Sequence, residues 1–135
     1  MNIKAKSFAL CALCLLAMLS CHRSDGPSQE ELAGRAAKIY YEYLRDGNYA
    51  AYVDGFYRPD SIPGCYREQL ITSAKQYVWQ MREDHKGLAA VEIAGAKADT
   101  AKHVGHAFLM LCFKDSVREE IVVPMVLHDG NWMLR

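Results

Sequence analysis

The sequence predicts a single α+β domain in which three helices precede a curved antiparallel sheet of four strands. The chain has 135 residues, which leaves room for one hydrophobic core after an exported leader is set aside. Apolar residues recur at helical spacing as far as Gly87, and their period changes to about two after it. Short turn sequences then join the strands, so we expect a meander with the helices packed on one of its faces.

Helix-start signals and glycines divide the first half of the domain into three helices. Ser28 and Glu31 have the spacing of a capping box, in which each side chain accepts a hydrogen bond from a backbone N–H at the helix start. Asn48 can cap a second, short helix in the same way. The predicted helices run from Ser28 to near Gly47, from Asn48 to about Phe56, and from about Cys65 to Lys86.

The second half of the domain has the alternation of a sheet. The second strand is apolar at both odd and even positions, so both of its faces need a cover. Pro124 lacks a backbone N–H and is therefore expected at a sheet edge or a bulge, where it bends the third strand. The predicted strands are Leu88–Ala94, Lys102–Lys114, Val117–His128 and Asn131–Arg135.

The first 20 residues have the features of an export signal. Lys4 and Lys6 precede an uncharged apolar run from Ser7 to Leu19, which is too short to span a bilayer as a helix. The run ends in Met18-Leu19-Ser20-Cys21, which resembles the bacterial lipobox. We therefore expect a lipoprotein signal peptide over residues 1–20, a lipidated Cys21 with a polar tether over 21–28, and the domain over 29–135.

This leader predicts a protein held in the bacterial cell envelope by its lipid, with the membrane leaflet left open. All 16 acidic residues follow Cys21, whereas two of the 16 basic residues precede it. The mature part is therefore slightly acidic, and its charge gives no reason to expect nucleic acid as a partner.

The order of the elements and several short motifs carry a resemblance to a known fold. The motifs are Tyr40-Tyr41-Glu42-Tyr43, Gly47-Asn48-Tyr49, Tyr52–Tyr57, Lys86-Gly87-Leu88, Val91-Glu92-Ile93, Val123–Val126 and Asp129–Trp132. In this order they resemble a family of small lipoproteins of Bacteroides and its relatives, with the cone-shaped cystatin-like fold of the nuclear-transport-factor-2-like superfamily. The resemblance implies a fold and a location, and it carries over no activity.

Enzymes of that superfamily use an acid or a histidine inside the cone beside a hydroxyl donor, so the resemblance suggests an isomerase or dehydratase as the alternative function. Asp54, His103, His106 and Tyr57 are the candidates. His103 and His106 fall on opposite faces of a strand and cannot form one site by themselves. We therefore expect these four residues to be surface or rim groups and expect no enzyme.

Metal and cofactor sites are not expected either. His85, His103, His106 and His128 lie on separate elements, and no metal-ligand spacing occurs. Cys65 and Cys112 are the two thiols of the domain. An oxidising envelope permits a disulfide between them, but the apolar surroundings of Cys112 favour two free thiols.

The leading prediction is a lipid-anchored binding module. Its open sheet face or cone cavity would bind a small ligand, an envelope protein or a second copy of the chain. Tyrosines at helical spacing are more often core residues, but some of them can line a ligand site. The candidate ligand-binding residues are Tyr40, Tyr57, Tyr77, Phe108, Met110 and Val126.

Overall fold

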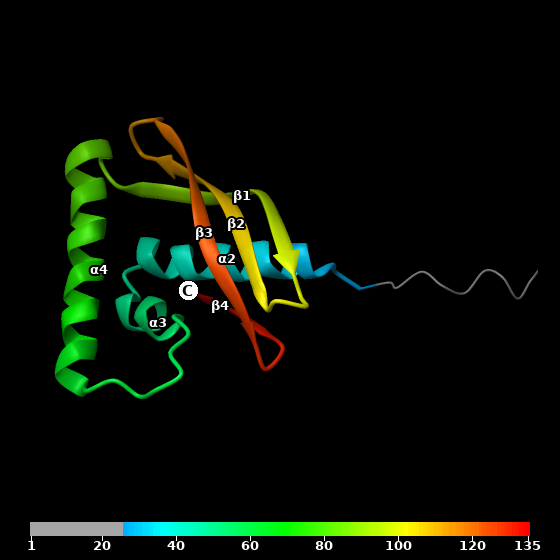
Figure 1. The fold of residues 1–135 in the computed structure, drawn as a ribbon. Coiled ribbons are helices and arrows are strands. Elements are labelled where there is room, and N and C mark those ends of the chain that lie inside the picture. Colours follow the sequence, from blue (N-terminus) through cyan, green and yellow to red (C-terminus); the bar gives the residue numbers. More distant parts are fainter. Residues whose placement is uncertain (1–25) are drawn as a thin grey trace, which may run out of the picture.

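The computed structural model describes residues 26–135 and has the predicted α+β order (Figure 1). Cys21 and the leader lie outside the described residues. The sheet is antiparallel, with the strands side by side in chain order. The described elements are α2 (Gln29–Arg45), α3 (Tyr49–Asp54), α4 (Gly64–His85), β1 (Leu88–Asp99), β2 (Val104–Phe113), β3 (Arg118–His128) and β4 (Asn131–Leu134).

Both predicted helix starts with a side-chain cap are confirmed. The Ser28 hydroxyl accepts from the Glu31 N–H at 3.2 Å, and a Glu31 carboxylate oxygen accepts from the Ser28 N–H at 3.0 Å. Asn48 caps α3 by accepting from the Ala51 N–H. These bonds satisfy backbone donors that the first turn of a helix leaves without partners. They therefore fix where α2 and α3 begin.

The three helices do not cover the sheet equally. Figure 1 shows α2 running across the strands on one face, whereas α4 stands at the end of the sheet and packs beside α3. The apolar residues follow this division. The main core joins α2 to the sheet, and a second cluster of Leu44, Val53, Ile71 and Ala74 lies among the helices. The predicted packing of helices against the sheet is present but unequal. α2 lies along the sheet, whereas α4 reaches it through Met81 near its end and directs Ile71 and Ala74 toward the other helices.

The main core is centred on the face of β2 that meets α2. Ala107, Leu109, Leu111 and Phe113 are buried there, and the intervening residues are less buried. On β3 the buried Val123 and Met125 continue this face. The period-two alternation predicted for the sheet is confirmed in both strands.

Strand β1 is five residues longer than predicted. Its pairing with β2 slips at two places, and the second slip lies between Ile93 and Gly95. An extra residue at such a bulge moves the following side chains to the opposite faces. Ile93 faces α2 before the slip and Ala96 faces it afterwards, so strict alternation stops at Ala94 although the strand continues to Asp99.

Pro124 lies at a position of β3 where no backbone hydrogen bond to a neighbouring strand needs its missing N–H. Its carbonyl accepts from the Arg135 N–H at 3.2 Å, and the pairing of β3 with β4 ends beside it at Met125 and Leu134. In a strand the N and O of one residue point to the same side, so the proline nitrogen faces the open end of short β4. The expected edge position is therefore confirmed.

Candidate functional site

The candidate acid–base residues do not meet inside the fold. Asp54 lies exposed at the end of α3, where both carboxylate oxygens accept from Arg67 at 2.8 Å. This hydrogen-bonded ion pair lowers the pKa of Asp54, so the group is held as a carboxylate. His106 projects from the open face of β2, and His103 lies in the turn before that strand. The described residues therefore offer no proton-transfer pair built from these groups.

Tyr57 contacts His128, a histidine that the sequence analysis did not name as its partner. The rings of Tyr57 and His128 are 4.7 Å apart between centroids. The two residues share a shallow hollow with His103 and Val126. In this hollow His128 Nε2 lies 3.2 Å from a carboxylate oxygen of Asp129, and among the described residues no hydrogen bond joins the Tyr57 hydroxyl to a histidine.

A partly buried histidine–carboxylate pair was missed by the sequence analysis. His85, in the last turn of α4, has its Nδ1 2.9 Å from a carboxylate oxygen of Asp115 in the β2–β3 turn, and its ring stacks on Phe113. Desolvation would raise the pKa of Asp115, but hydrogen bonds from His85 and the Val117 N–H outweigh it and lower that pKa. The pair links α4 to the sheet. Thirty residues separate its members, and no local pattern signals such a contact.

The two thiols are free; Cys65 lies at the start of α4, and Cys112 lies on β2 next to Phe113, which contacts the last turn of α4. Cys65 is exposed in the first turn, and Cys112 is half-buried on β2. The last turn of α4 contacts the β2–β3 turn through His85, and a helix of 20 residues is about 30 Å long. A disulfide needs Cα atoms within about 7 Å, so the disulfide alternative is not realised in this fold.

Within residues 26–135 no helix is long and apolar enough to cross a bilayer, and no group of three or more histidine, cysteine or acidic side chains is placed to hold a metal ion.

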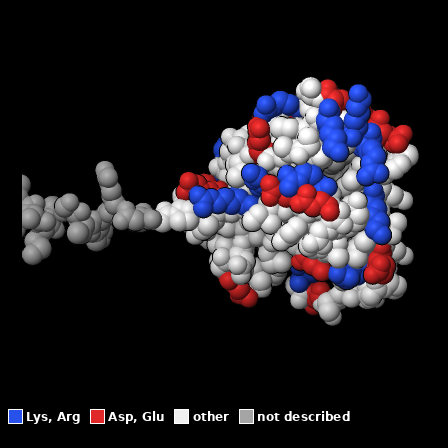
Figure 2. Space-filling model, turned by 180° about the vertical axis from the view of Figure 1, so that it is seen from behind, with Lys and Arg blue, Asp and Glu red and all other residues white. Residues whose placement is uncertain are grey.

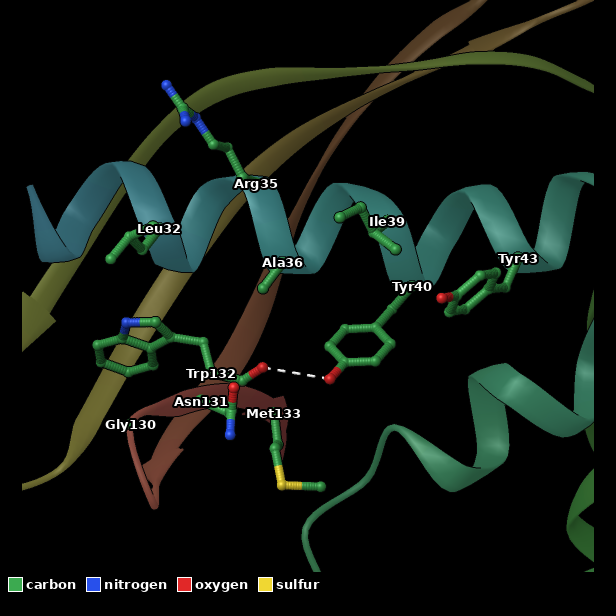
Figure 3. Close-up of a pocket in the computed structure, with 10 residues that line it drawn as sticks. All are labelled: Leu32, Arg35, Ala36, Ile39, Tyr40, Tyr43, Gly130, Asn131, Trp132 and Met133. Carbon is green, nitrogen blue, oxygen red and sulfur yellow. Dashed lines mark hydrogen bonds between the residues drawn. The ribbon is translucent and has the colours of Figure 1, made fainter. Parts of the chain in front are cut away.

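A groove of about 540 Å³ separates α2 from β4 (Figure 3). Tyr40 lies in it, but its hydroxyl donates to the Trp132 carbonyl at 3.2 Å, and Arg35 points away from β4 in this view. Burial raises the pKa of Tyr40. The tyrosine therefore ties α2 to the last strand, which is a structural contact rather than a free ligand-binding group.

The second candidate, Tyr77, lines a different cavity, between α3 and α4. Its volume is about 310 Å³. Tyr40, Tyr57 and Tyr77 therefore lie at three separate places and do not form one aromatic cradle. The lining residues of this cavity are Tyr52, Val53, Phe56, Arg58, Leu70, Ser73, Ala74 and Tyr77.

Phe108, Met110 and Val126 do share a surface, which is the sheet face opposite α2. Register places Phe108 beside Val122 of β3, and Val122 is 55% exposed. No described helix covers this face, which is turned toward the viewer in Figure 1. We call it the open face and define it by its central residues Val104, Phe108, Met110, Val122, Pro124 and Val126; His106 and Glu120 project from the same face beside them.

The side of the molecule opposite the open face, where α2 covers the sheet, carries many charged side chains. On the side seen in Figure 2, Lys and Arg side chains gather along one edge of the molecule, and elsewhere on this side they lie beside Asp and Glu side chains. Charged side chains of both signs are typical of solvent-facing helices.

Comparison with known proteins supports the fold and leaves the activity open. No family model matches the chain, and no curated protein sequence is significantly similar to it. Among solved structures, a protein of Campylobacter jejuni provisionally named an NTF2-like transpeptidase aligns with a TM-score of 0.60 and 10% identity, over 74% of this chain and 94% of its own. At that identity the likeness shows the fold alone. The domain therefore has an NTF2-like fold, as the order of its sequence motifs suggested.

Proposed function

We propose that the protein is a lipid-anchored binding module of the bacterial cell envelope, not an enzyme, and that it docks through the open face of its sheet. The observation that carries the proposal is a sheet face whose central residues are mostly apolar and which no described helix covers. Exposed contiguous apolar surface on a soluble domain marks an interaction site. The absence of an assembled acid–base pair among Asp54, His103, His106 and Tyr57 supports the choice of a binding role.

Charges around the open face favour a second copy of the chain as the occupant. Glu92, whose carboxylate already pairs with Arg118 of β3, lies one row from Phe108 toward one end of the strands, and Lys97 lies one row away toward the other end. Consider two copies with their open faces in contact, related by a two-fold axis. The axis lies in the plane between the two sheets, runs perpendicular to the strands and passes over Phe108, so the strands of the second copy run in the opposite direction. It therefore places Glu92 of each copy over Lys97 of the other, while Val122 meets its own counterpart.

The same axis suits two proteins anchored in one bilayer. Figure 1 shows α2 crossing the strands, so the axis and α2 run in similar directions. Both copies of α2 then begin on the same side of the pair. Each Cys21 lies seven residues before Ser28, and a short extended tether from either copy can reach the same membrane surface.

The anchor is tested by intact-mass spectrometry of protein purified from membranes of the source bacterium. We expect Cys21 as the first residue, carrying a diacylglycerol and bound acyl chains. A Cys21→Ser variant should leave the lipid-modified form undetectable, because the serine hydroxyl cannot take the place of the thiol in the lipid transfer. Detection of the unsubstituted protein with residues 1–20 still attached, or with position 21 unmodified, would refute the anchor.

The pairing is tested by cysteine cross-linking of the full-length protein in its membrane, with Cys65 and Cys112 both replaced by serine. We expect Val122→Cys to give a disulfide dimer on mild oxidation, because the two-fold axis passes beside this position. The matched control is Ile39→Cys on α2, which is similarly exposed at 47% and lies outside the open face. It should cross-link roughly tenfold less, since no partner surface holds it near its counterpart.

A charge swap separates the proposed pairing from chance collisions. In the Val122→Cys background, Lys97→Glu places like charges over one another and should reduce the dimer roughly tenfold. Adding Glu92→Lys and Arg118→Glu restores opposite charges between the copies, keeps an ion pair within each copy and should restore the dimer. Equal cross-linking at positions 39 and 122, or no recovery in the swapped protein, would exclude this docking mode.

A further inference from the structure

We infer that the cavity between α3 and α4 is a binding site for a small carboxylate with a flat apolar body. All its lining residues come from the two helices and the segment after α3, and none belongs to the sheet. The site is therefore separate from the open face, and its test succeeds or fails independently of the pairing.

The walls of the cavity suit a flat apolar group. Tyr52 packs edge-on against Phe56, with ring centroids 5.3 Å apart, and Tyr77 closes the cavity from α4. Leu70 and Ala74 supply aliphatic surface. At about 310 Å³ the cavity is at the small end of ligand pockets, so it fits a body of one or two rings.

Arg58 supplies the charge that selects an anion. One of its N–H groups donates to the Val53 carbonyl at 2.9 Å, and its Cζ lies 5.6 Å from the centroid of the Phe56 ring. These two contacts hold the planar guanidinium at the cavity while leaving most of its five N–H donors unused.

No carboxylate among the described residues is in ion-pair contact with this guanidinium, although its charge helps to lower the pKa of nearby Asp54. Among the described residues Arg58 forms no ion pair, and its neighbour Asp54 is committed through both oxygens to Arg67. A half-buried cation without an anionic partner attracts one from solution, and a carboxylate can take two parallel hydrogen bonds from a guanidinium. Ser73 offers a hydroxyl at the same cavity, although it already donates to the Gln69 carbonyl. The oxygen of Ser73 can therefore still accept a hydrogen bond from a protonated group of the ligand.

The probe that tests this inference is 6-fluoro-2-naphthoate, followed by fluorine NMR with the full-length protein in phosphatidylcholine vesicles. Empty vesicles report partition into lipid. We expect saturable broadening of the fluorine signal that 2-naphthoate reverses at roughly tenfold lower concentration than the neutral 2-naphthalenemethanol, because only the acid can pair with Arg58. Equal competition by the alcohol, or no saturable binding at millimolar probe, would overturn the inference.

Substitutions locate the binding. Arg58→Gln should weaken probe binding roughly tenfold or more, and Arg58→Lys should weaken it less because it keeps the charge but loses the planar fork. Arg35→Gln, in the separate groove beside α2, is the matched control and should bind normally.

A second variant keeps the test valid if Arg58→Gln unfolds. Ser73→Trp changes an exposed residue at the cavity, so it fills the space without removing a core side chain. It should abolish probe binding while the circular dichroism spectrum and the thermal midpoint stay near those of the unsubstituted protein. Undiminished binding in a folded Ser73→Trp or Arg58→Gln protein would place the probe elsewhere and overturn the assignment.

Discussion

Replacing Trp132 by alanine is expected to lower the free energy of unfolding by about 3–5 kcal/mol, the usual cost of truncating a buried tryptophan. Trp132 is 5% exposed, and its indole N–H donates to the Gln29 side chain at 3.0 Å. The ring also lies against Gly105 on β2. One side chain thus joins the last strand to the first turn of α2 and to the start of β2.

The measurement is urea unfolding followed by circular dichroism, and Gln29→Leu is the control. Gln29→Leu removes only the hydrogen bond from the indole, so it should cost about 1 kcal/mol. A protein of this size has a total stability of about 5–15 kcal/mol, so Trp132→Ala should leave it only marginally folded. If the two variants lose equal stability, the indole contributes its hydrogen bond and little packing, contrary to the structure.

Local signals in the sequence predicted the starts of the elements well. The capping box at Ser28 and the cap at Asn48 involve residues only three positions apart, so the sequence contains both partners of each bond. The alternation along β2 is local in the same sense, and it correctly divided the strand into a buried and an open face. Such features need no knowledge of the rest of the chain.

The end of β1 and the position of α4 could not be predicted in this way. The bulge between Ile93 and Gly95 changes which residues face α2, and it is defined by register with β2 rather than by β1 itself. The packing of α4 depends on Leu44 and Val53, which belong to other helices. The end of β1 and the position of α4 both depend on tertiary contacts, and the spacing of apolar residues within one segment does not predict such contacts.

The candidate sites show the same limit. The sequence identified Phe108, Met110 and Val126, because strand alternation alone places them on one face. It identified Tyr77 but not Arg58, which lies in a loop with prolines and carries no periodic signal. Residues of that loop and of α4 line the cavity together, and Asp54 forms its hydrogen-bonded ion pair with Arg67 rather than with Arg58. Distant contacts of this kind determine which charges remain free.

Gly105→Ala is the second substitution with a large expected effect, a loss of about 1–3 kcal/mol in the free energy of unfolding. A Cβ at this position would lie 2.8 Å from the Lys97 carbonyl oxygen and 3.0 Å from the Trp132 ring, so either the β1–β2 ladder or the indole must move. The matched control is Gly64→Ala at the start of α4, where a Cβ meets nothing within 4 Å. That change restricts the unfolded chain and should be neutral or stabilising by up to about 1 kcal/mol. The measurement is the urea midpoint of unfolding, which should fall for Gly105→Ala and stay unchanged or rise for Gly64→Ala. That result would show that the close approach of β1 and Trp132 to Gly105, and not the loss of a glycine as such, causes the loss of stability. Equal midpoints for the two variants would contradict it.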